Sequence, residues 1–159
     1  MLELHNELIE EEAMIGGDSK RPRQQQVDSH AEMMKSVESG RAVVVIAEAD
    51  GKAVGQSNAR KRSGRLRHTA GLGVFVKKQY RNQGIGSMMM MMMMMMMMEL
   101  ENQARKIGVE ILYLEVYGVS PAVRLYERLG YREYGRLPGG IKYRGEYVDR
   151  VSMYKRIAG

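Results

Sequence analysis

The sequence predicts a mixed α/β fold in which one mostly antiparallel sheet carries helices on both of its faces. Two observations lead to this fold class. Residues 42–76 consist of β-branched and apolar runs separated by turn dipeptides, which is typical of an antiparallel meander. From residue 84 onward, helix-like and strand-like segments alternate. A chain of 159 residues can bury one hydrophobic core, so we predict a single domain over residues 1–159.

Two helices are expected before the meander. Residues 1–14 alternate apolar and acidic side chains with helical spacing, which predicts an amphipathic helix. Residues 16–26 (GGDSKRPRQQQ) carry Gly, Pro and a polar run and are predicted to form a loop. Asp28 is a suitable N-cap for a second helix, which should end at Gly40.

Strands are predicted at residues 42–49, 52–61 and 66–76. Asp50-Gly51 between the first two is a strong two-residue hairpin signal, and Ser63-Gly64 marks a second turn. A long helix should then run over residues 84–106. Eleven consecutive methionines, residues 88–98, would continue this helix but make every face of it apolar, so no function is inferred from them.

The C-terminal part of the chain should add three strands and one helix. Residues 111–117 (ILYLEVY) form a continuous apolar run, which predicts a buried strand. A helix should follow from Pro121 to Leu129 and stop at Gly130. Residues 131–137 and 146–157 are predicted to be strands, with Pro138-Gly139-Gly140 as a turn or loop between them.

Composition excludes several classes of site. The chain has no cysteine, so it forms no disulfide, thiolate metal site or cysteine nucleophile, and it suits the reducing cytoplasm. Its three histidines lack metal-ligand spacing, so we expect no metal. We also expect no membrane span, because the methionine run is 11 residues long and a spanning helix needs about 20.

The chain is basic, with a net charge of +6 and a pI near 9.6. Such a surface could attract an anionic ligand or nucleic acid, or could have no specific partner. Residues 58–68 (NARKRSGRLRH) are strongly basic and could bind RNA or an acidic substrate. Basic runs of this kind are more often solvated hairpins, so a nucleic-acid partner is not expected.

The stretch QYRNQGIGS, residues 79–87, follows a strand and opens a helix, which is an arrangement that can bind phosphate. Helix-initial N–H groups have no internal partner, and glycine lets a ligand approach the backbone. Arg81 lies at the mouth of this loop as a donor, and Ser87 adds a hydroxyl group. The P-loop pattern and the third glycine of a dinucleotide fingerprint are both missing, and a simple turn with a helix cap is the alternative.

Two motifs together carry a resemblance to a known family. Residues 81–86 (RNQGIG) match the [QR]-x-x-G-x-[GA] loop of the GCN5-related N-acetyltransferase (GNAT) superfamily. Residues 122–131 (AVRLYERLGY) resemble that family's A-x-x-L-Y-x-K-x-G-F motif, and residues 139–154 resemble its closing strand pair. The resemblance covers roughly residues 40–157 and implies the GNAT fold, in which this chain would lack the first strand.

The resemblance implies a binding site for acetyl-CoA. The main chain of Val74, Phe75 and Val76 would pair with the pantetheine arm as another strand would, and Arg81 would assist at the diphosphate. An N–H group of Phe75 or Val76 would polarise the thioester carbonyl. The diphosphate itself would lie on Asn82, Gln83, Gly84, Ile85, Gly86 and Ser87.

The resemblance also assigns the proton transfers. Tyr126, the tyrosine of the second motif, would be the general acid for the leaving thiolate, with helix packing as its alternative role. Many relatives place a general base near Gly71, which cannot accept a proton. Glu115 is the nearest substitute, acting through water, although a structural role is nearly as well supported. Val119 stands where the family often has Asn, and Ser120 could partly replace it.

These inferences lead to one expected function. The chain should be a cytoplasmic N-acetyltransferase that moves the acetyl group of acetyl-CoA to a primary amine of a small molecule or amino acid by direct attack. The alternatives are a protein N-terminal or lysine acetyltransferase, and a non-catalytic module that binds CoA or nucleic acid. A homodimer is left open.

Overall fold

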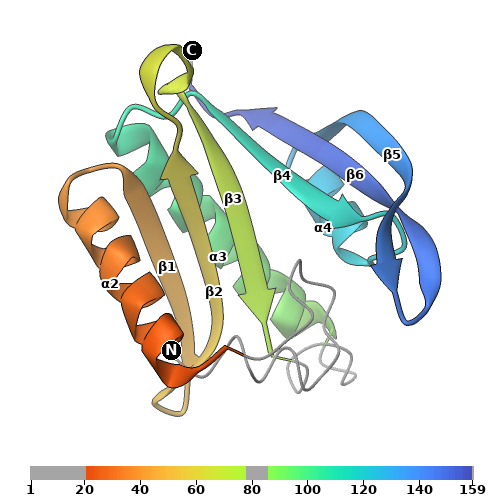
Figure 1. Ribbon diagram of the computed structural model, residues 1–159, viewed down its shortest axis with the longest axis horizontal. Helices are drawn as coiled ribbons and strands as arrows, with labels where there is room; N and C mark the ends of the chain where they lie inside the picture. Colours follow the sequence, from red (N-terminus) through yellow and green to blue (C-terminus); the bar gives the residue numbers. More distant parts are fainter. Residues whose placement is uncertain (1–20, 78–85, 159) are drawn as a thin grey trace.

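The computed structural model describes residues 21–77 and 86–158, with side chains omitted for residues 86–90. Six strands form one sheet in the order β1-β2-β3-β4-β6-β5 (Figure 1). Only β3 and β4 are parallel; the other four neighbouring pairs are antiparallel, which confirms the predicted fold class. The strands are β1 (Ala42–Ala49), β2 (Lys52–Lys61), β3 (Thr69–Val76), β4 (Ile111–Tyr117), β5 (Arg132–Tyr143) and β6 (Glu146–Arg156).

Helices lie on both faces of the sheet. The helix α2 (Arg23–Glu38) lies against β1 on one face, while α3 (Gly86–Lys106) and α4 (Ala122–Arg128) lie behind the sheet on the other (Figure 1). The main core forms between the sheet and α3 with α4. Its fully buried members include Met97, Leu100 and Ala104 of α3, and Leu112 of β4.

The second helix begins earlier than predicted, with Pro22 rather than Asp28 at its N-cap position. Arg23 to Gln26 are helical, so the predicted loop over residues 16–26 is wrong at its C-terminal end. The N–H group of Gln26 donates to the carbonyl oxygen of Pro22, and the Gln24 amide donates to Asp28 on the next turn. A proline beside a first helical turn loses nothing, because the N–H group it lacks would have no helical partner there.

The turns between strands account for two further differences. Asp50 and Gly51 have φ values of +53° and +75°, which confirms the predicted hairpin between β1 and β2. The third strand starts at Thr69 rather than residue 66, because Gly64–Leu66 form a short 3-10 helix, η1. The Thr69 hydroxyl donates to the carbonyl oxygen of Leu66 and fixes the end of that helix.

The Pro138-Gly139-Gly140 segment is a bulge rather than the predicted turn or loop. β5 continues through it to Tyr143, and its register against β6 shifts between Leu137 and Ile141. The Asp149 carboxylate accepts hydrogen bonds from the Gly139 N–H and from the Arg136 guanidinium, so it holds the bulge in place. Arg136 is also the main reason that the pKa of Asp149 lies below its usual value.

The true turn between β5 and β6 is Arg144-Gly145. Both residues have positive φ, +51° and +78°, as a two-residue hairpin of this type requires. The pattern Arg-Gly is a weaker turn signal than Asp-Gly, and the preceding Pro-Gly-Gly drew the prediction away from it. β5 and β6 therefore form one long hairpin at the edge of the sheet (Figure 1).

The pairing between β3 and β4 is short. It joins Thr69 to Ile111, Ala70 to Leu112 and Gly71 to Tyr113, and it ends there. Beyond that point β3 stays with β2 as far as Val76, while β4 stays with β6 as far as Tyr117. The two strands therefore diverge, as Figure 1 shows.

No helix in the described ranges 21–77 and 86–158 is long and apolar enough to cross a membrane. The helix predicted over residues 1–14 lies outside the described residues.

Candidate active site

The divergence of β3 and β4 gives β3 a sheet edge without a strand partner. Phe75 pairs with Gln56 of β2, and Val76 pairs with Gly55, so one edge of this segment is occupied. The other edge of this segment has no pairing with β4, because the last β3–β4 pair joins Gly71 to Tyr113. The segment that contains Val74, Phe75 and Val76 therefore has the arrangement that the predicted pantetheine contact requires.

The start of α3 lies in the chain shortly after this edge. Gly86 is the first residue of α3, so the predicted phosphate loop leads directly into a helix N-terminus. Arg81, Asn82, Gln83, Gly84 and Ile85 lie outside the described residues, and the side chain of Ser87 is not described. The diphosphate contact at these residues stays a prediction.

Tyr126 lies on α4, on the same face of the sheet as α3. It is 7% exposed, and its ring packs edge-on against the ring of Tyr131, with centroids 5.9 Å apart. Burial raises the pKa of Tyr126 from 10.0 to about 12. The phenol therefore stays protonated throughout the neutral and mildly alkaline range, although it is a weaker acid than an ordinary tyrosine.

Glu115 lies on the opposite face of β4. Leu114 and Val116 point toward the core, so the side chain between them points away from it. The Glu115 side chain is 54% exposed, and its carboxylate lies 3.8 Å from the guanidinium of Arg150 on β6. The predicted strand over residues 111–117 is confirmed, but it is fully buried on one face only, because burial alternates along β4 and Glu115 is exposed.

The two predicted proton-transfer residues thus lie on opposite faces of the sheet. Tyr126 is on the face that carries α3 and α4. Glu115 is on what we call the outer face, which bears Tyr113, Glu115 and Tyr117 of β4.

Of the two departures from the family pattern, Gly71 has a local explanation and Val119 has none. A Cβ atom at Gly71 would lie 3.4 Å from the Tyr113 hydroxyl, so a side chain there would compete with Tyr113 for space on the outer face. The Ser120 hydroxyl accepts a hydrogen bond from the Ala122 N–H and caps α4. Val119 is exposed, and nothing in the structure explains its presence there.

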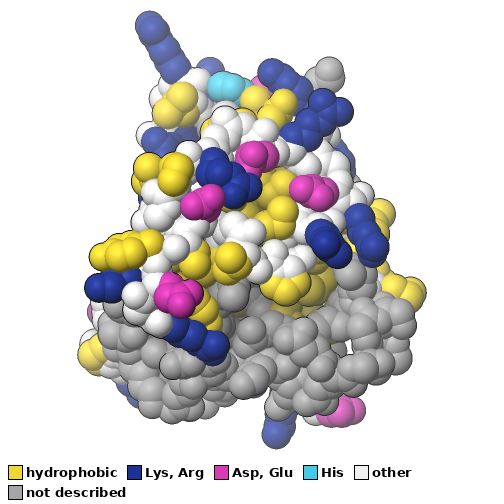
Figure 2. Space-filling model, turned by 90° about the vertical axis from the view of Figure 1, so that its right-hand side faces the viewer, with side chains coloured by type: hydrophobic (Ala, Val, Ile, Leu, Met, Phe, Trp, Pro, Cys, Tyr) yellow, Lys and Arg dark blue, Asp and Glu magenta, His cyan; other side chains and the backbone are white. Residues whose placement is uncertain are grey.

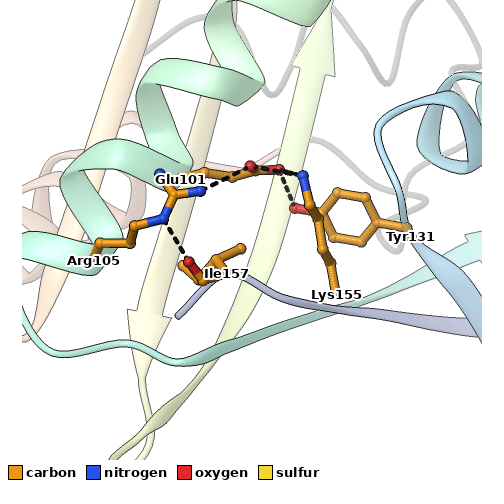
Figure 3. A network of polar contacts seen from close by, with 5 residues as sticks. All are labelled: Glu101, Arg105, Tyr131, Lys155 and Ile157. Atoms are coloured by element: carbon orange, nitrogen blue, oxygen red, sulfur yellow. Dashed lines mark hydrogen bonds and ion pairs between the residues drawn. The ribbon is translucent and has the colours of Figure 1, made fainter. Parts of the chain in front are cut away.

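A buried polar network next to Tyr126 was missed by sequence reasoning (Figure 3). The Glu101 side chain on α3 is 5% exposed and accepts hydrogen bonds from Lys155 at 2.9 and 3.1 Å and from the Tyr131 hydroxyl at 3.2 Å. Arg105 lies 3.7 Å from the same carboxylate and donates to the carbonyl oxygen of Ile157. Burial, and then the Glu101 charge, raise the pKa of Tyr131 above its ordinary range.

This network holds in place the ring of Tyr131, which packs against Tyr126. Tyr131, whose ring contacts that of Tyr126, is itself tied to α3 and β6 through Glu101 and Lys155. The available signal was Tyr131, which stands where the resembled motif has Phe. A hydroxyl group at a buried position needs a hydrogen-bond partner. An acidic residue of α3, Glu101, is that partner.

Charges of both signs are mixed over the face of the molecule nearest β5 and β6. Figure 2 shows basic and acidic side chains lying among hydrophobic ones on this face. Glu115–Arg150 is one such pair, and Arg136 with Glu133 and Asp149 is another. On the described part of this face, acidic side chains therefore interrupt the basic ones.

A family model described as an acetyltransferase (GNAT) domain matches residues 40–133. The chain belongs to this family. The GNAT match spans the diverging strands, the start of α3 and Tyr126, so it covers the elements from which the site is built. The chain is therefore an acetyltransferase of the GNAT family.

Solved structures share the GNAT fold at low sequence identity. A ribosomal-protein-alanine N-acetyltransferase from Brucella melitensis is 24% identical, with a TM-score of 0.77 and coverage of 98% of this chain and 91% of that one. YncA from Salmonella typhimurium, solved with its cofactor acetyl-CoA, is 19% identical, with a TM-score of 0.79 and coverage of 99% and 87%.

A phosphinothricin acetyltransferase from Sinorhizobium meliloti, in complex with acetyl-CoA, is 15% identical, with a TM-score of 0.78 and coverage of 99% of this chain and 81% of that one. No curated protein matches the chain in sequence. The names of these relatives include two very different acceptors, a ribosomal protein and phosphinothricin. The fold is therefore shared by enzymes with different acceptors.

Proposed function

We propose that this GNAT enzyme acetylates the primary amine of a small molecule or amino acid by direct attack on the thioester, in the cytoplasm that its cysteine-free sequence suits. The observation that carries the proposal is the divergence of β3 and β4, with Glu115 on the outer face two residues beyond the last β3–β4 pair and Tyr126 on the opposite face of the sheet. Opposite faces would let one residue act on the attacking amine and the other on the leaving sulfur.

Three groups of the chain have separate tasks in this mechanism. Acetyl-CoA supplies the thioester when it is bound. Glu115 takes the proton of the attacking amine, directly or through a water molecule, because its exposed carboxylate can reach solvent. The N–H group of Phe75 or Val76 donates to the carbonyl oxygen, and the Tyr126 hydroxyl gives a proton to the departing sulfur.

The raised pKa of Tyr126 affects how this last step proceeds. A phenol with a pKa of about 12 transfers its proton to a free thiolate less readily than a solvated tyrosine does. Tyr126 therefore acts first as a hydrogen-bond donor to the sulfur, and the proton moves as the carbon–sulfur bond breaks. A buried donor of this kind strengthens as charge develops on its acceptor.

The acceptor class is the first point to test. Purified protein is incubated with acetyl-CoA and a panel of amino acids, small amines, peptides with free N-termini and lysine peptides, and thiol release is measured. Thiol release that depends on a small amine or amino acid supports the proposal. Release only with peptides favours the protein-acetyltransferase alternative, and no release with any amine, together with retained acetyl-CoA binding, favours the non-catalytic one.

Acetyl-CoA should stabilise the folded protein. At 100 times its Kd, a ligand that binds only the native state adds about 2.7 kcal/mol to the free energy of unfolding. Urea titrations with and without acetyl-CoA measure this shift. A short acetyl thioester that lacks the nucleotide and diphosphate is the control and should stabilise the protein much less; equal stabilisation by both ligands would contradict the diphosphate site.

Glu115→Gln should lower kcat/KM about tenfold near neutral pH, a modest loss for a general base, because water has access to this exposed position. The deficit should shrink as the pH rises toward the pKa of the amine, since an amine that is already neutral needs no base before it attacks. The pH profile of wild type and variant measures this change. A deficit of the same size at every pH would contradict the assignment.

A further inference from the structure

The ion pair between Glu115 and Arg150 lies where the acceptor of the proposed reaction must approach. β4 and β6 are antiparallel neighbours, and Arg150 lies opposite Tyr117, two residues from Glu115 on the same face. The closest oxygen and nitrogen atoms are 3.8 Å apart, which is too long for a hydrogen bond. The side chains are 54% and 43% exposed, so both charges remain available to a ligand.

Small residues make the surface beside this pair flat. Gly71 lies opposite Tyr113, and Ser152 lies between Glu115 on one neighbouring strand and Gly135 on the other. The Asn58 side chain covers Gly73 and Tyr113 covers Gly71, but a Cβ atom at Gly135 would meet only the Cβ atom of Ser152, at 4.0 Å. A ligand can therefore lie close to the main chain at Gly135 and Ser152, beside Glu115.

Tyrosines border this flat surface along the strands. Tyr154 lies opposite Tyr113 and packs edge-on against Tyr134, with ring centroids 5.7 Å apart. On the other side of Glu115, Tyr117 packs against Tyr143 at 5.3 Å. These rings offer apolar contact area, while the charged groups lie between them.

We infer that Arg150 binds the carboxylate of an α-amino acid acceptor while Glu115 receives its amine. This inference rests on the proposed function and names the class of acceptor for it. A free α-amino acid carries an ammonium group and a carboxylate close together, and the outer face presents the two opposite charges close together. The guanidinium can hold a carboxylate through two parallel hydrogen bonds.

Binding replaces one weak pair by two stronger ones. The Glu115–Arg150 pair is exposed and lacks a hydrogen bond, so opening it loses little. The ammonium group first loses a proton to Glu115, which releases it to water. The neutral nitrogen then bonds to the acetyl carbon and loses its second proton to Glu115 as the carbon–sulfur bond breaks. The sulfur receives a proton from Tyr126, which regains one from solvent, so two protons leave the nitrogen, one reaches the sulfur and one is released. The acceptor side chain packs on the tyrosines.

The competing acceptor, a protein N-terminus, does not use Arg150 in this way. Its first residue has an amide carbonyl in place of the carboxylate, so the guanidinium gains no charged partner there. The two acceptors can be separated with L-phenylalanine and L-phenylalaninamide, which differ only in this group. Their kcat/KM ratio reports recognition of the carboxylate, and changes common to both probes cancel.

The ratio of kcat/KM for L-phenylalanine over L-phenylalaninamide should fall about 30-fold in Arg150→Gln, mainly through the KM of the acid, since the lost hydrogen bonds join charged groups. Arg150→Lys should restore part of the ratio, because lysine keeps the positive charge but cannot donate the two parallel hydrogen bonds of a guanidinium. Arg156→Gln changes another exposed arginine of β6 and should leave the ratio as in wild type.

Three results would overturn the inference. An unchanged ratio in Arg150→Gln would remove the carboxylate contact. The second result is that the enzyme acetylates a tripeptide with a free N-terminus faster than the amino acid, and that Arg150→Gln does not lower this rate. It would identify a protein N-terminus as the acceptor, and the chain would still be a transferase. The third result is that the wild-type protein binds acetyl-CoA but acetylates none of the probes, which would contradict both this inference and the proposed function.

Discussion

Tyr126→Phe is expected to lower kcat about 100-fold, because general acid catalysis contributes at least that much in comparable enzymes. The KM for acetyl-CoA should change little, since the substitution keeps the ring and its edge-on contact with Tyr131. The free energy of unfolding should not fall, because the pKa shift of Tyr126 comes from burial and not from a hydrogen bond. Steady-state kinetics and urea titration measure these three quantities.

Tyr131→Phe is the matched control, since it removes the same hydroxyl group five residues along the chain. Here the hydroxyl donates to the buried Glu101, so its loss should lower the free energy of unfolding by about 1.5 kcal/mol and change kcat much less. The two variants should therefore separate, one in activity and one in stability. Equal kcat in wild type and Tyr126→Phe would remove Tyr126 from the mechanism.

Lys155→Met should lower the free energy of unfolding by about 3 kcal/mol, because breaking a buried pair leaves an uncompensated charge. Lys155 donates twice to Glu101, whose side chain is 5% exposed, and the nearest other cation, Arg105, stays 3.7 Å from the carboxylate. Met fills a similar volume, so the loss reports the charge rather than a cavity. Urea titration at neutral pH measures it.

Two further variants test the origin of this loss. Lys142→Met makes the same substitution on exposed β5 and should leave the unfolding midpoint unchanged. In the double variant Glu101→Leu/Lys155→Met no buried charge remains unpaired, so most of the stability should return. A double variant as unstable as Lys155→Met alone would show that packing, rather than the unpaired carboxylate, causes the loss.

Much of the sheet could be predicted because its local signals agree with its tertiary structure. Asp50-Gly51 requires positive φ at two successive residues and so fixes the first hairpin. The errors arose where tertiary contacts override local signals. Pro138-Gly139-Gly140 has the composition of a turn, but the Asp149 side chain, nine residues beyond Gly140, holds it as a bulge within a continuing strand.

The site was predicted only as far as a motif identifies its residues. Tyr126 and Glu115 could be named, because one lies in the family motif and the other is the nearest acid to a missing base. Their opposite faces follow from the alternation along β4, which the apolar sequence of residues 111–117 conceals. Arg150 and Glu101 could not be named, since each gains its meaning from a partner on another element.

The short pairing between β3 and β4 has a mechanical consequence. The sheet consists of two three-stranded plates, β1-β2-β3 and β4-β6-β5, and the three residue pairs between β3 and β4 form the seam that joins them. In the proposed reaction the thioester binds to β3 in the first plate, while the base, Glu115, belongs to β4 in the second. A twist of one plate against the other would move the reacting atoms apart, so the rate of transfer depends on the stiffness of this seam as well as on the side chains beside it.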